Sequence, residues 1–473
     1  MAIDECVVHA GPRLGSALMA SPQGHSGKTI VTLGLSRLLK HRGFSIQPFK
    51  KGPDYIDPSW LAVAAGRSCR NLDSFLIPID RLITCFQQST EDVDLALVEG
   101  AMGLYDGLES ERNGTTAGLA RVLGIPVVLI VNTARMTRSI AALVSGYQHF
   151  EPETPIAGVI LNCVSGPRHE GKLRDAIERY CRIPVVASIP RRESFRMAER
   201  HLGLVPSKES RESESLVEQV ARDMEPYVDL EEFLRIAGTF RNTLEKKSEV
   251  GPSEEKRVRI GVIHDQVFNF YYPENLEALC RKGVELICFD SIKDRMPEVD
   301  GLLIGGGFPE FHLERLEENR GLRGDILTAV ERGLPVYAEC AGLMYLCRKV
   351  HWQGRSYDMV GVVPGEVQLS SKPQGHGYVI AEVVKENPLF PVGLTVRGHE
   401  LHHSSLFRVD GLRCAYRIRR GHGIDGEWDG FFYKNLFASY LHLHALGTPE
   451  WADLFVKLAL DRKATFHGDV RLS

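Results

Sequence analysis

The 473-residue chain contains no uninterrupted apolar stretch of about 18 residues, the length that a membrane-spanning helix needs. It also lacks a large charge of one sign: its formal net charge is −4, which argues against a general nucleic-acid-binding protein. Residues 1–13 have no apolar core, so we expect an N-terminal tail and not a secretory signal. These absences favour a cytoplasmic protein with neither a membrane nor a nucleic acid as its partner.

The ten cysteines are scattered and show no paired spacing of the metal-binding kind. Their distribution argues against a disulfide framework or a zinc site and predicts reduced thiols. With 43% hydrophobic and 25% charged residues, the chain has the composition of an ordinary globular protein. Its length is sufficient for two or three domains.

Short apolar segments alternate with helical patterns along the first half of the chain. We expect strands at 94–99, 125–132 and 156–162, and the spacing of Val31, Leu35 and Leu38 predicts a helix over 30–40. Alternation of this kind predicts a parallel α/β sheet whose loops at the carboxyl ends of the strands form the site.

From residue 207 the composition changes, because Ser, Glu, Lys and Arg begin to dominate. We expect helices over 216–227 and 230–236 and an exposed linker at 238–257. A new apolar strand at 258–263 opens a second domain. The predicted organisation is a P-loop parallel-sheet domain at 1–237 followed, after the linker, by a second α/β domain at 258–473.

A phosphate-binding loop is indicated by Gly27, Lys28 and Thr29 at the start of the predicted helix. Backbone N–H groups would cradle a phosphate, the lysine would neutralise it, and the threonine hydroxyl would reach Mg²⁺. The first glycine of the usual motif is replaced by Pro22, and a lone Gly-Lys-Thr is more often a coincidence. We assign Gln23 and Ser26 to the same loop.

A charged segment follows at 47–58, where Lys50, Asp54, Tyr55 and Asp57 surround a Gly-Pro turn. It is equally consistent with a substrate site and with a charged surface turn. We expect Glu99, at the end of an apolar strand, to order a metal together with Thr29 and Asp54, with Asp106 nearby. Asp57 is either a Mg²⁺ partner or a substrate-orienting group.

Arginines at 67 and 70 are candidate carboxylate-binding groups, because guanidinium forks bind carboxylates in a bidentate way. For Arg67 and Arg70 a solvated surface position is nearly as well supported. Together with Lys50 and its neighbour Lys51, they would suit a substrate that carries several carboxylates.

A candidate nucleophile, Cys340, lies between an apolar run at 334–338 and a helix-compatible run at 343–346. This pattern predicts a strand, a sharp turn and a helix, which would place the thiol at a helix N-terminus where thiolate is favoured. For a lone cysteine a buried core position is the commoner outcome. About a hundred residues later, Ser-Tyr-Leu-His-Leu-His supplies His442 and His444 as candidate general bases.

These segments, in this order, resemble the cobyrinate a,c-diamide synthase family. The resemblance rests on Pro-Gln-x-x-x-Gly-Lys-Thr, Pro-Phe-Lys-Lys-Gly-Pro-Asp-Tyr-Ile-Asp-Pro, Gly-Arg-Ser-Cys-Arg-Asn-Leu-Asp, Ala-Glu-Cys-Ala-Gly-Leu-Met-Tyr and Ser-Tyr-Leu-His-Leu-His. It implies a dethiobiotin-synthetase-like ATPase domain followed by a class I glutamine amidotransferase domain. In such enzymes Cys340 would attack the glutamine amide, with His442 as its base.

The resemblance has further implications and two departures. It places Asn162 at the adenine edge, although a strand-end turn residue is as well supported. It also places the Gly-Gly-Gly segment at 305–307 beside Cys340, and it gives the His-rich segment 398–404 no catalytic metal. Ala341 stands where many members have glycine. His444 stands where related glutaminases carry a glutamate that orients the base, so the group that orients His442 remains unassigned.

The implied reaction is an ATP-, Mg²⁺- and glutamine-dependent amidation of the a and c acetate groups of a tetrapyrrole, with cobyrinate as the first expectation. The proline-containing segment at 372–378 leaves sirohydrochlorin, its nickel form or sirohaem as alternatives. A partition-type or regulatory P-loop ATPase is the alternative from a different class, and the pair Cys340 and His442 argues against it. The expected partners are a tetrapyrrole and L-glutamine, and a homodimer is left open.

Overall fold

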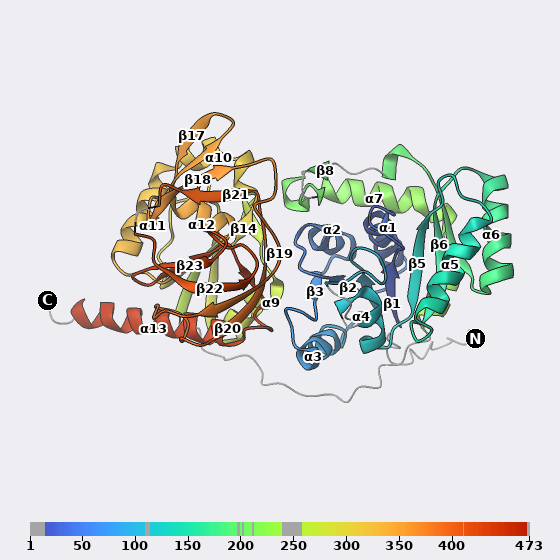
Figure 1. The fold of residues 1–473 in the computed structure, drawn as a ribbon, viewed down its shortest axis with the longest axis horizontal. Coiled ribbons are helices and arrows are strands. Elements are labelled where there is room, and N and C mark those ends of the chain that lie inside the picture. The colour runs from blue at the N-terminus through green and yellow to red at the C-terminus, as the bar shows by residue number, and fades with distance from the viewer. Residues whose placement is uncertain are drawn as a thin grey trace, which may run out of the picture. The chain divides into compact units, whose positions relative to one another are not determined.

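The computed structural model describes residues 15–108, 114–195, 199–200, 203–210, 212–238, 258–409 and 411–470. The chain forms two compact units (Figure 1). Unit 1 extends up to Ser74 and from Ile79 to Lys247, and unit 2 comprises Phe75–Pro78 and the chain from Ser248 onward. The predicted tail at 1–13 lies outside the described residues, as does all but the first residue of the predicted linker at 238–257.

Unit 1 is built on a seven-stranded sheet with the order β3-β2-β4-β1-β5-β6-β7, in which all neighbouring strands are parallel. The strands are β1 (Gly15–Ala20), β2 (Ile46–Lys51), β3 (Arg70–Leu72), β4 (Leu95–Glu99), β5 (Val127–Asn132), β6 (Ile156–Val164) and β7 (Val185–Pro190). Strands β1, β2 and β4 are buried along their whole length, as expected for a sheet covered on both faces.

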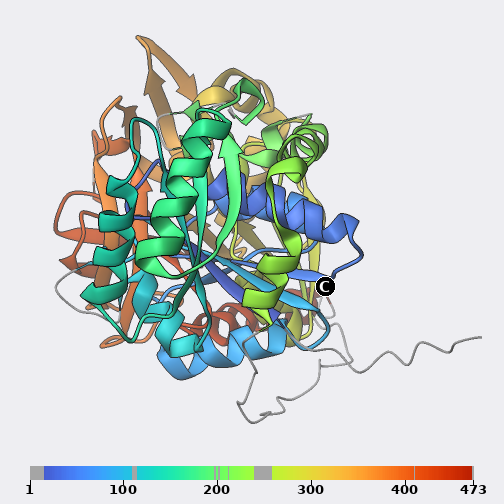
Figure 2. The same cartoon turned by 90° about the vertical axis from the view of Figure 1, so that its right-hand side faces the viewer.

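Helices flank this parallel sheet, and Figures 1 and 2 show its strands lying between them. They are α1 (Lys28–His41), α2 (Ile56–Ala65), α3 (Ile79–Ser89), α4 (Thr116–Leu123), α5 (Ser139–Phe150), α6 (Pro167–Cys181), α7 (Ser213–Met224) and α8 (Leu230–Ala237). A two-stranded ribbon, β8 (Glu199–Arg200) with β9 (Gly203–Leu204), completes the unit. The predicted parallel α/β domain is therefore confirmed.

The first helix follows the predicted apolar spacing. Val31, Leu35 and Leu38 are each 1% exposed, and Val31 and Leu35 belong to the core cluster that joins α1 to the sheet and α7. The helix begins two residues before the predicted position, directly after Gly27. A short loop therefore connects the carboxyl end of β1 to the N-terminus of α1. This arrangement exposes backbone N–H groups to an anion.

Unit 2 contains a ten-stranded mixed sheet with the order β12-β10-β13-β15-β24-β23-β22-β19-β20-β25. Strands from β12 to β24 run parallel, and the remaining neighbours are antiparallel. They are β10 (Val258–Ile263), β12 (Val284–Phe289), β13 (Gly301–Ile304), β15 (Val336–Glu339), β19 (Gly375–Val383), β20 (Thr395–His402), β22 (Cys414–Arg420), β23 (Trp428–Tyr433), β24 (Leu436–Ser439) and β25 (His442–Leu443).

Smaller elements surround this second sheet. A four-stranded sheet joins β16 (Cys347–Trp352), β17 (Arg355–Asp358), β18 (Val363–Leu369) and β21 (Ser404–Phe407), and a two-stranded pair joins β11 (Phe268–Phe270) and β14 (Gly306–Gly307). The helices are α9 (Pro273–Arg281), α10 (Leu313–Glu318), α11 (Arg320–Glu331), α12 (Ala341–Leu346) and α13 (Glu450–Val470). Among the described residues, no helix is both long enough and apolar enough to span a bilayer.

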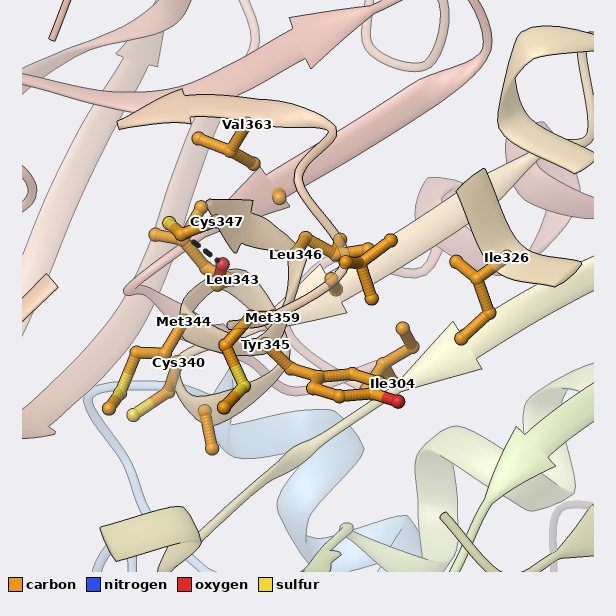
Figure 3. Close-up of a cluster of buried hydrophobic side chains, with 14 of the residues drawn as sticks. Ile304, Ile326, Cys340, Leu343, Met344, Tyr345, Leu346, Cys347, Met359 and Val363 are labelled. Atoms are coloured by element: carbon orange, nitrogen blue, oxygen red, sulfur yellow. Dashed lines mark hydrogen bonds between the residues drawn. The ribbon is translucent and has the colours of Figure 1, made fainter. Parts of the chain in front are cut away.

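Helix α12 lies in the middle of one core of unit 2. All six of its residues are buried, and the five other than Gly342 are at most 3% exposed. Figure 3 shows Leu343, Leu346 and Tyr345 packed among neighbouring apolar side chains, with Cys340 and Met344 at one edge of the cluster. This packing fixes the turn that precedes the helix and hence the position of Cys340.

The tight packing around α12 predicts a loss of stability on adding one methyl group. In Gly342→Ala the new Cβ would lie 2.5 Å from the backbone oxygen of Ile304, so we expect a destabilisation of about 1–3 kcal/mol. Urea unfolding followed by tryptophan fluorescence measures it, because three of the four tryptophans are in unit 2.

Gly324→Ala in α11 is the matched control. A Cβ at this exposed position would meet nothing within 4 Å, and alanine favours the helix by about 0.5–1 kcal/mol. The two variants should therefore move the midpoint in opposite directions. An unchanged midpoint in Gly342→Ala would contradict the contact with Ile304.

Candidate functional site

The loop between β1 and α1 is held by its own side chains. The hydroxyls of Ser21 and Ser26 donate to the backbone oxygen of Gln23 at 2.6 and 2.9 Å. Gly27 has φ 90°, and a Cβ there would lie 2.2 Å from Nδ2 of Asn162, so both conformation and space require glycine. An anion bound at the start of α1 would meet the backbone N–H groups of the helix N-terminus.

The Lys28 ammonium bridges this loop and the loop after β4. Its Nζ donates to Oγ of Ser21 at 2.8 Å and to the backbone oxygen of Met102 at 2.6 Å. Burial, reinforced by the charge of Lys50, lowers the pKa of Lys28 to about 8. Its direct partners are neutral oxygens, so an incoming anion would provide the opposite charge that they do not.

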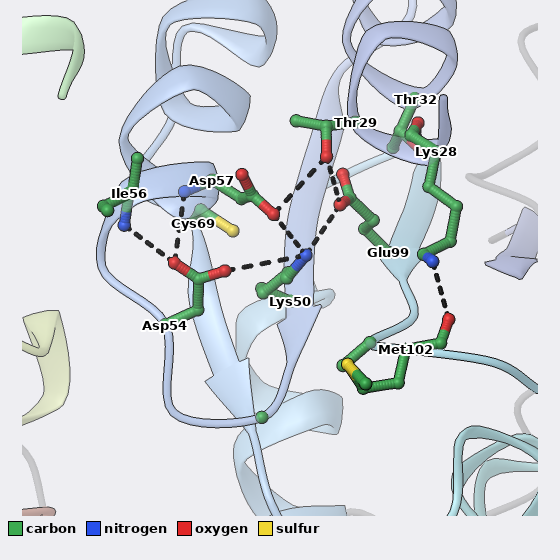
Figure 4. Close-up of polar contacts among 12 residues, drawn as sticks. Lys28, Thr29, Thr32, Lys50, Asp54, Ile56, Asp57, Cys69, Glu99 and Met102 are labelled. Carbon is green, nitrogen blue, oxygen red and sulfur yellow. Dashed lines mark hydrogen bonds and ion pairs between the residues drawn. The ribbon is translucent and has the colours of Figure 1, made fainter. Parts of the chain in front are cut away.

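A second lysine, Lys50, is surrounded by three carboxylates at the carboxyl ends of β2 and β4 and the start of α2. Its Nζ lies 2.6 Å from Asp57, 2.7 Å from Glu99 and 3.7 Å from Asp54. Figure 4 shows the ammonium between these side chains. Because Lys50 and Glu99 pair in register on neighbouring parallel strands, the sheet itself brings them together.

The three carboxyl groups respond differently to this environment. Burial raises the pKa of Asp54 to about 7, and the charge of Asp57 adds to the effect. Burial also raises the pKa of Glu99. For Asp57 burial acts in the same direction, but the charge and hydrogen bond of Lys50 outweigh it and lower the pKa. Lys50 itself is disfavoured by burial, yet the carboxylates hold its pKa well above the usual value.

Thr29 is grouped with Glu99 and Asp57. Its hydroxyl donates to Glu99 at 2.9 Å and to Asp57 at 3.4 Å. Asp54 has another partner set, because one of its oxygens accepts from the backbone N–H groups of Ile56 and Asp57 at 2.8 and 3.2 Å. The structure thus puts Asp57, and not Asp54, beside the predicted metal residues Thr29 and Glu99.

Other predicted residues have mainly supporting contacts. Asn162 donates from Nδ2 to the backbone oxygen of Ser26 at 2.9 Å, and its Oδ1 accepts from the N–H of Cys163. Arg67 forms an ion pair with Asp92 at 2.6 Å and donates to Gln47. Asn162 therefore contacts the phosphate loop, and Arg67 takes part in a surface ion pair.

The remaining predicted substrate residues lie near Lys50 and its carboxylates, Tyr55 through the chain and Arg70 through strand pairing. Tyr55 immediately precedes α2, and Arg70 pairs in register with Phe49, one residue before Lys50. A residue that the sequence did not single out, Asn71, donates to the backbone oxygens of Gly52 and Asp54 at 2.8 and 2.7 Å. It holds the turn that carries the carboxylates.

The carboxylate group fits a Mg²⁺ ion that arrives with a nucleotide. Within the described part of the chain, Oε2 of the fully buried Glu99 has no hydrogen-bond partner. Thr29 and Asp57 supply further hard oxygen atoms beside it. No described group of three or more His, Cys, Asp or Glu side chains is arranged to hold a metal by itself. Binding through one or two carboxylates plus phosphate oxygens is the usual mode for Mg²⁺.

In unit 2, Cys340 occupies the sharp turn between β15 and α12. It has φ 48° and ψ −103°, a conformation that costs a non-glycine residue about 1–3 kcal/mol. Its own N–H donates to the backbone oxygen of Ser439 at 2.7 Å, and its carbonyl accepts from Met344 at 3.1 Å. The predicted strand–turn–helix arrangement is confirmed, and a strained turn of this kind is typical of a functional side chain.

The imidazole of His442 lies between Cys340 and Glu339. It is hydrogen-bonded to the Cys340 side chain, and its Nδ1 lies 3.2 Å from Oε2 of Glu339. Burial disfavours the charged ring, but these two contacts raise the pKa of His442 to about 10. A protonated imidazole beside a cysteine favours the thiolate, which is the nucleophilic form.

Gly306 and Asp429 help to position His442, a role that the sequence did not reveal for either residue. A Cβ on Gly306 would lie 2.5 Å from Cε1 of His442, so the predicted Gly-Gly-Gly segment makes room for the ring. The fully buried Asp429 accepts from the backbone N–H groups of Tyr440 and Leu441 at 3.1 and 3.2 Å. These contacts fix the segment that leads to His442.

The His-rich segment packs against the same site. The ring of His399 is stacked on His442 with centroids 4.9 Å apart, and His402 is stacked on Tyr440 at 3.8 Å. Burial, followed by the charge of His442, lowers the pKa of His399 well below its usual value. Segment 398–404 thus contributes a neutral ring that covers one face of the candidate base.

Two family models match the chain, one on each half. Residues 17–205 match the CobQ/CobB/MinD/ParA nucleotide binding domain, and residues 259–450 match the CobB/CobQ-like glutamine amidotransferase domain. The first match covers the Lys28 and Lys50 sites, and the second covers Cys340 and His442.

Curated relatives match nearly the whole length. Proteins named cobyrinate a,c-diamide synthase from Magnetococcus marinus, Listeria innocua and Archaeoglobus fulgidus are 42%, 40% and 39% identical to this chain. The alignments cover 95%, 92% and 94% of this chain and 98%, 97% and 98% of the respective relatives. With this coverage and both family models in the expected order, the chain belongs to the cobyrinate a,c-diamide synthase family.

Proposed function

We propose that this chain uses ATP and glutamine to convert the a and c acetate carboxylates of cobyrinate to carboxamides. The observation that carries the proposal is the pairing of Cys340 with His442 in a chain 42% identical, over 95% of its length, to a cobyrinate a,c-diamide synthase. A phosphate-type loop and a lysine–carboxylate group in unit 1 support the ATP-dependent half.

In the glutaminase half, Cys340 attacks the side-chain amide carbon of glutamine. His442 passes a proton to the leaving nitrogen, so ammonia departs and a glutamyl thioester remains on Cys340. Water then cleaves the thioester and releases glutamate. Backbone N–H groups at the start of α12 are candidate donors to the oxyanion that forms in both steps.

In the synthetase half, a substrate carboxylate attacks the γ-phosphate of ATP and gives an acyl phosphate. Lys28 and the N–H groups at the start of α1 hold phosphate oxygens as charge spreads over them. Ammonia then displaces phosphate, which yields the carboxamide. Activation is needed because a carboxylate is a very poor acceptor of an amine at neutral pH.

Mg²⁺, when bound with the nucleotide, would neutralise phosphate charge and orient the transferred group. Thr29, Asp57 and Glu99 are the residues that would hold it. Lys50 compensates the negative charges of Asp57 and Glu99 and holds both side chains in position to bind the ion. The proposal also includes binding of the adenine by Asn162. It further includes binding of the tetrapyrrole by Arg67, Arg70 and Tyr55.

The alternative substrates and the alternative class of protein are less well supported than this proposal. The three relatives carry the name of the cobyrinate enzyme, so sirohydrochlorin, its nickel form and sirohaem are not favoured. A partition-type ATPase would have no use for Cys340 and His442. A homodimer and a cytoplasmic location stay predictions of the sequence.

Removing the nucleophile separates the two half-reactions. In Cys340→Ala we expect glutamine-dependent amidation to fall at least about 10³-fold, because no thioester can form, while free ammonia still supports amidation. The assay measures carboxamide formation with each nitrogen source. Glutamine-dependent turnover of Cys340→Ala at the wild-type rate would contradict the role of Cys340.

The lowered pKa of Lys28 predicts a pH dependence of nucleotide binding. The pKa of about 8 means that the free protein loses the ammonium charge as the pH rises above 8, whereas a bound phosphate would keep it protonated. The Kd for Mg²⁺–ATP should therefore increase by about tenfold per pH unit between pH 8.5 and 9.5. Isothermal titration calorimetry measures this Kd.

Lys28→Ala serves as the control for that titration. It should bind Mg²⁺–ATP weakly and without this pH dependence, and it should not amidate with either nitrogen source. A wild-type Kd that is constant over the same pH range would show that Lys28 does not supply the titrating charge.

Mass spectrometry of the product tests the substrate. With ATP, Mg²⁺ and glutamine, cobyrinate should show two successive carboxyl-to-amide mass changes, while sirohydrochlorin, nickel sirohydrochlorin and sirohaem remain unmodified. Amidation of one of the other rings in preference to cobyrinate would overturn the substrate assignment and leave the ligase chemistry intact.

A further inference from the structure

We propose that Glu339, the residue directly before the nucleophile, is the positioning residue of His442 and takes the place of the glutamate that related glutaminases carry two residues after the histidine. This inference rests on the proposed glutaminase role of Cys340. His444 stands where related glutaminases have the glutamate that orients the base, and Glu339 would orient the base in its place.

The contacts of Glu339 connect it to both sides of His442. Oε2 lies 3.2 Å from Nδ1 of the imidazole, and Oε1 accepts from the N–H of Leu443 at 3.1 Å. The hydroxyl of Tyr337 donates to the same Oε1 at 3.0 Å. Glu339 is 5% exposed and His442 is 1% exposed, so water does not replace these bonds. Both carboxylate oxygens are thus assigned to fixing the histidine segment.

The sheet explains why a residue next to Cys340 can reach His442. Strands β15 and β24 are parallel neighbours, and Glu339 pairs in register with Ser439. The chain turns after Ser439 and returns as β25, which begins with His442. The last side chain of β15 therefore meets the first residue of β25 at the carboxyl edge of the sheet.

The contact also determines the tautomer of the imidazole. An ionised carboxylate only accepts hydrogen bonds, so Nδ1 must carry a hydrogen, and this leaves Nε2 for the proton that moves to and from Cys340. The negative charge of Glu339 also stabilises the imidazolium. These are the two tasks of the aspartate in Ser-His-Asp enzymes, which orients the ring and stabilises its charged form.

Residue 444, where related enzymes have the glutamate, has other contacts. His444 is fully buried, lies 3.6 Å from Glu274 and packs against the ring of Tyr272 at 4.5 Å. Its Nδ1 accepts from the N–H of Leu446 at 3.2 Å. The titratable groups that contact His442 among the described residues include Cys340, Glu339 and the stacked ring of His399, whereas His444 interacts electrostatically with His399.

Glu339→Gln tests the proposal in the full-length protein. The side-chain amide can donate to Nδ1 and so favours the wrong tautomer, and it carries no charge. We expect kcat for glutamine hydrolysis to fall by roughly 10²- to 10⁴-fold with KM for glutamine changed less than about threefold. The pH at which Cys340 is half-alkylated by iodoacetamide should rise, because the imidazolium beside it is less stable.

Glu274→Gln is the matched control, because it removes the carboxylate beside His444 and leaves the carboxylate beside His442 in place. It should leave kcat and the alkylation profile within about threefold of wild type. A wild-type kcat and alkylation profile in Glu339→Gln would overturn the proposal, as would a loss in Glu274→Gln that equals the loss in Glu339→Gln. If Glu339→Gln does not fold, Glu339→Asp carries the test: its shorter side chain should lower kcat with KM retained, and a wild-type kcat would overturn the proposal.

Amidation with free ammonia distinguishes this inference from the proposed function. Glu339→Gln should retain ammonia-dependent amidation of cobyrinate at the wild-type rate, because the synthetase half does not use His442. Absence of amidation in the wild-type protein with either nitrogen source would refute the proposed function. Normal amidation with ammonia together with an unaffected glutaminase in Glu339→Gln would refute only the role of Glu339.

Discussion

The carboxyl ends of parallel strands meet at one edge of a sheet, and both candidate sites of this protein depend on that constraint. In unit 1 it brings Lys50 at the end of β2 next to Glu99 at the end of β4, although 48 residues separate them along the chain. In unit 2 it brings Glu339 at the end of β15 to the segment after β24 that carries His442. In each case the pairing of hydrophobic strands determines which polar groups meet, and the polar groups themselves come from short segments that the strands position.

Burial imposes a second requirement, because a charge removed from water must be paired. Lys50 supplies the positive charge that its three carboxylate neighbours share, and removing Lys50 would leave buried carboxylates unpaired, at a cost of about 3–5 kcal/mol for a buried pair. The unpartnered oxygen of Glu99 shows that the group is not saturated within the described residues. A cation that arrives with a nucleotide would complete it. The same residues can therefore be stable without a ligand and still bind one.

Motif and spacing were sufficient to predict the parallel α/β fold of unit 1, the start of α1 near Lys28 and the strand–turn–helix at Cys340, since each depends on residues close together in the chain. They were not sufficient to choose between Asp54 and Asp57 as the neighbour of Thr29, because that depends on which carboxylate the first turn of α2 uses as its own cap. They also missed Glu339, although it adjoins the nucleophile. Its role follows from strand register, which a single sequence does not reveal.

The two reactive cations show how contacts decide what burial does to a charge. Lys28 and His442 are both buried, yet the pKa of Lys28 falls to about 8 while that of His442 rises to about 10. Lys28 touches a hydroxyl and a backbone carbonyl, whereas His442 touches a carboxylate and a thiol. A buried cation whose direct partners are neutral gains most from an incoming anion, which suits phosphate binding. A buried cation already paired with a carboxylate keeps its proton until a substrate draws it away, which suits proton transfer beside a nucleophile.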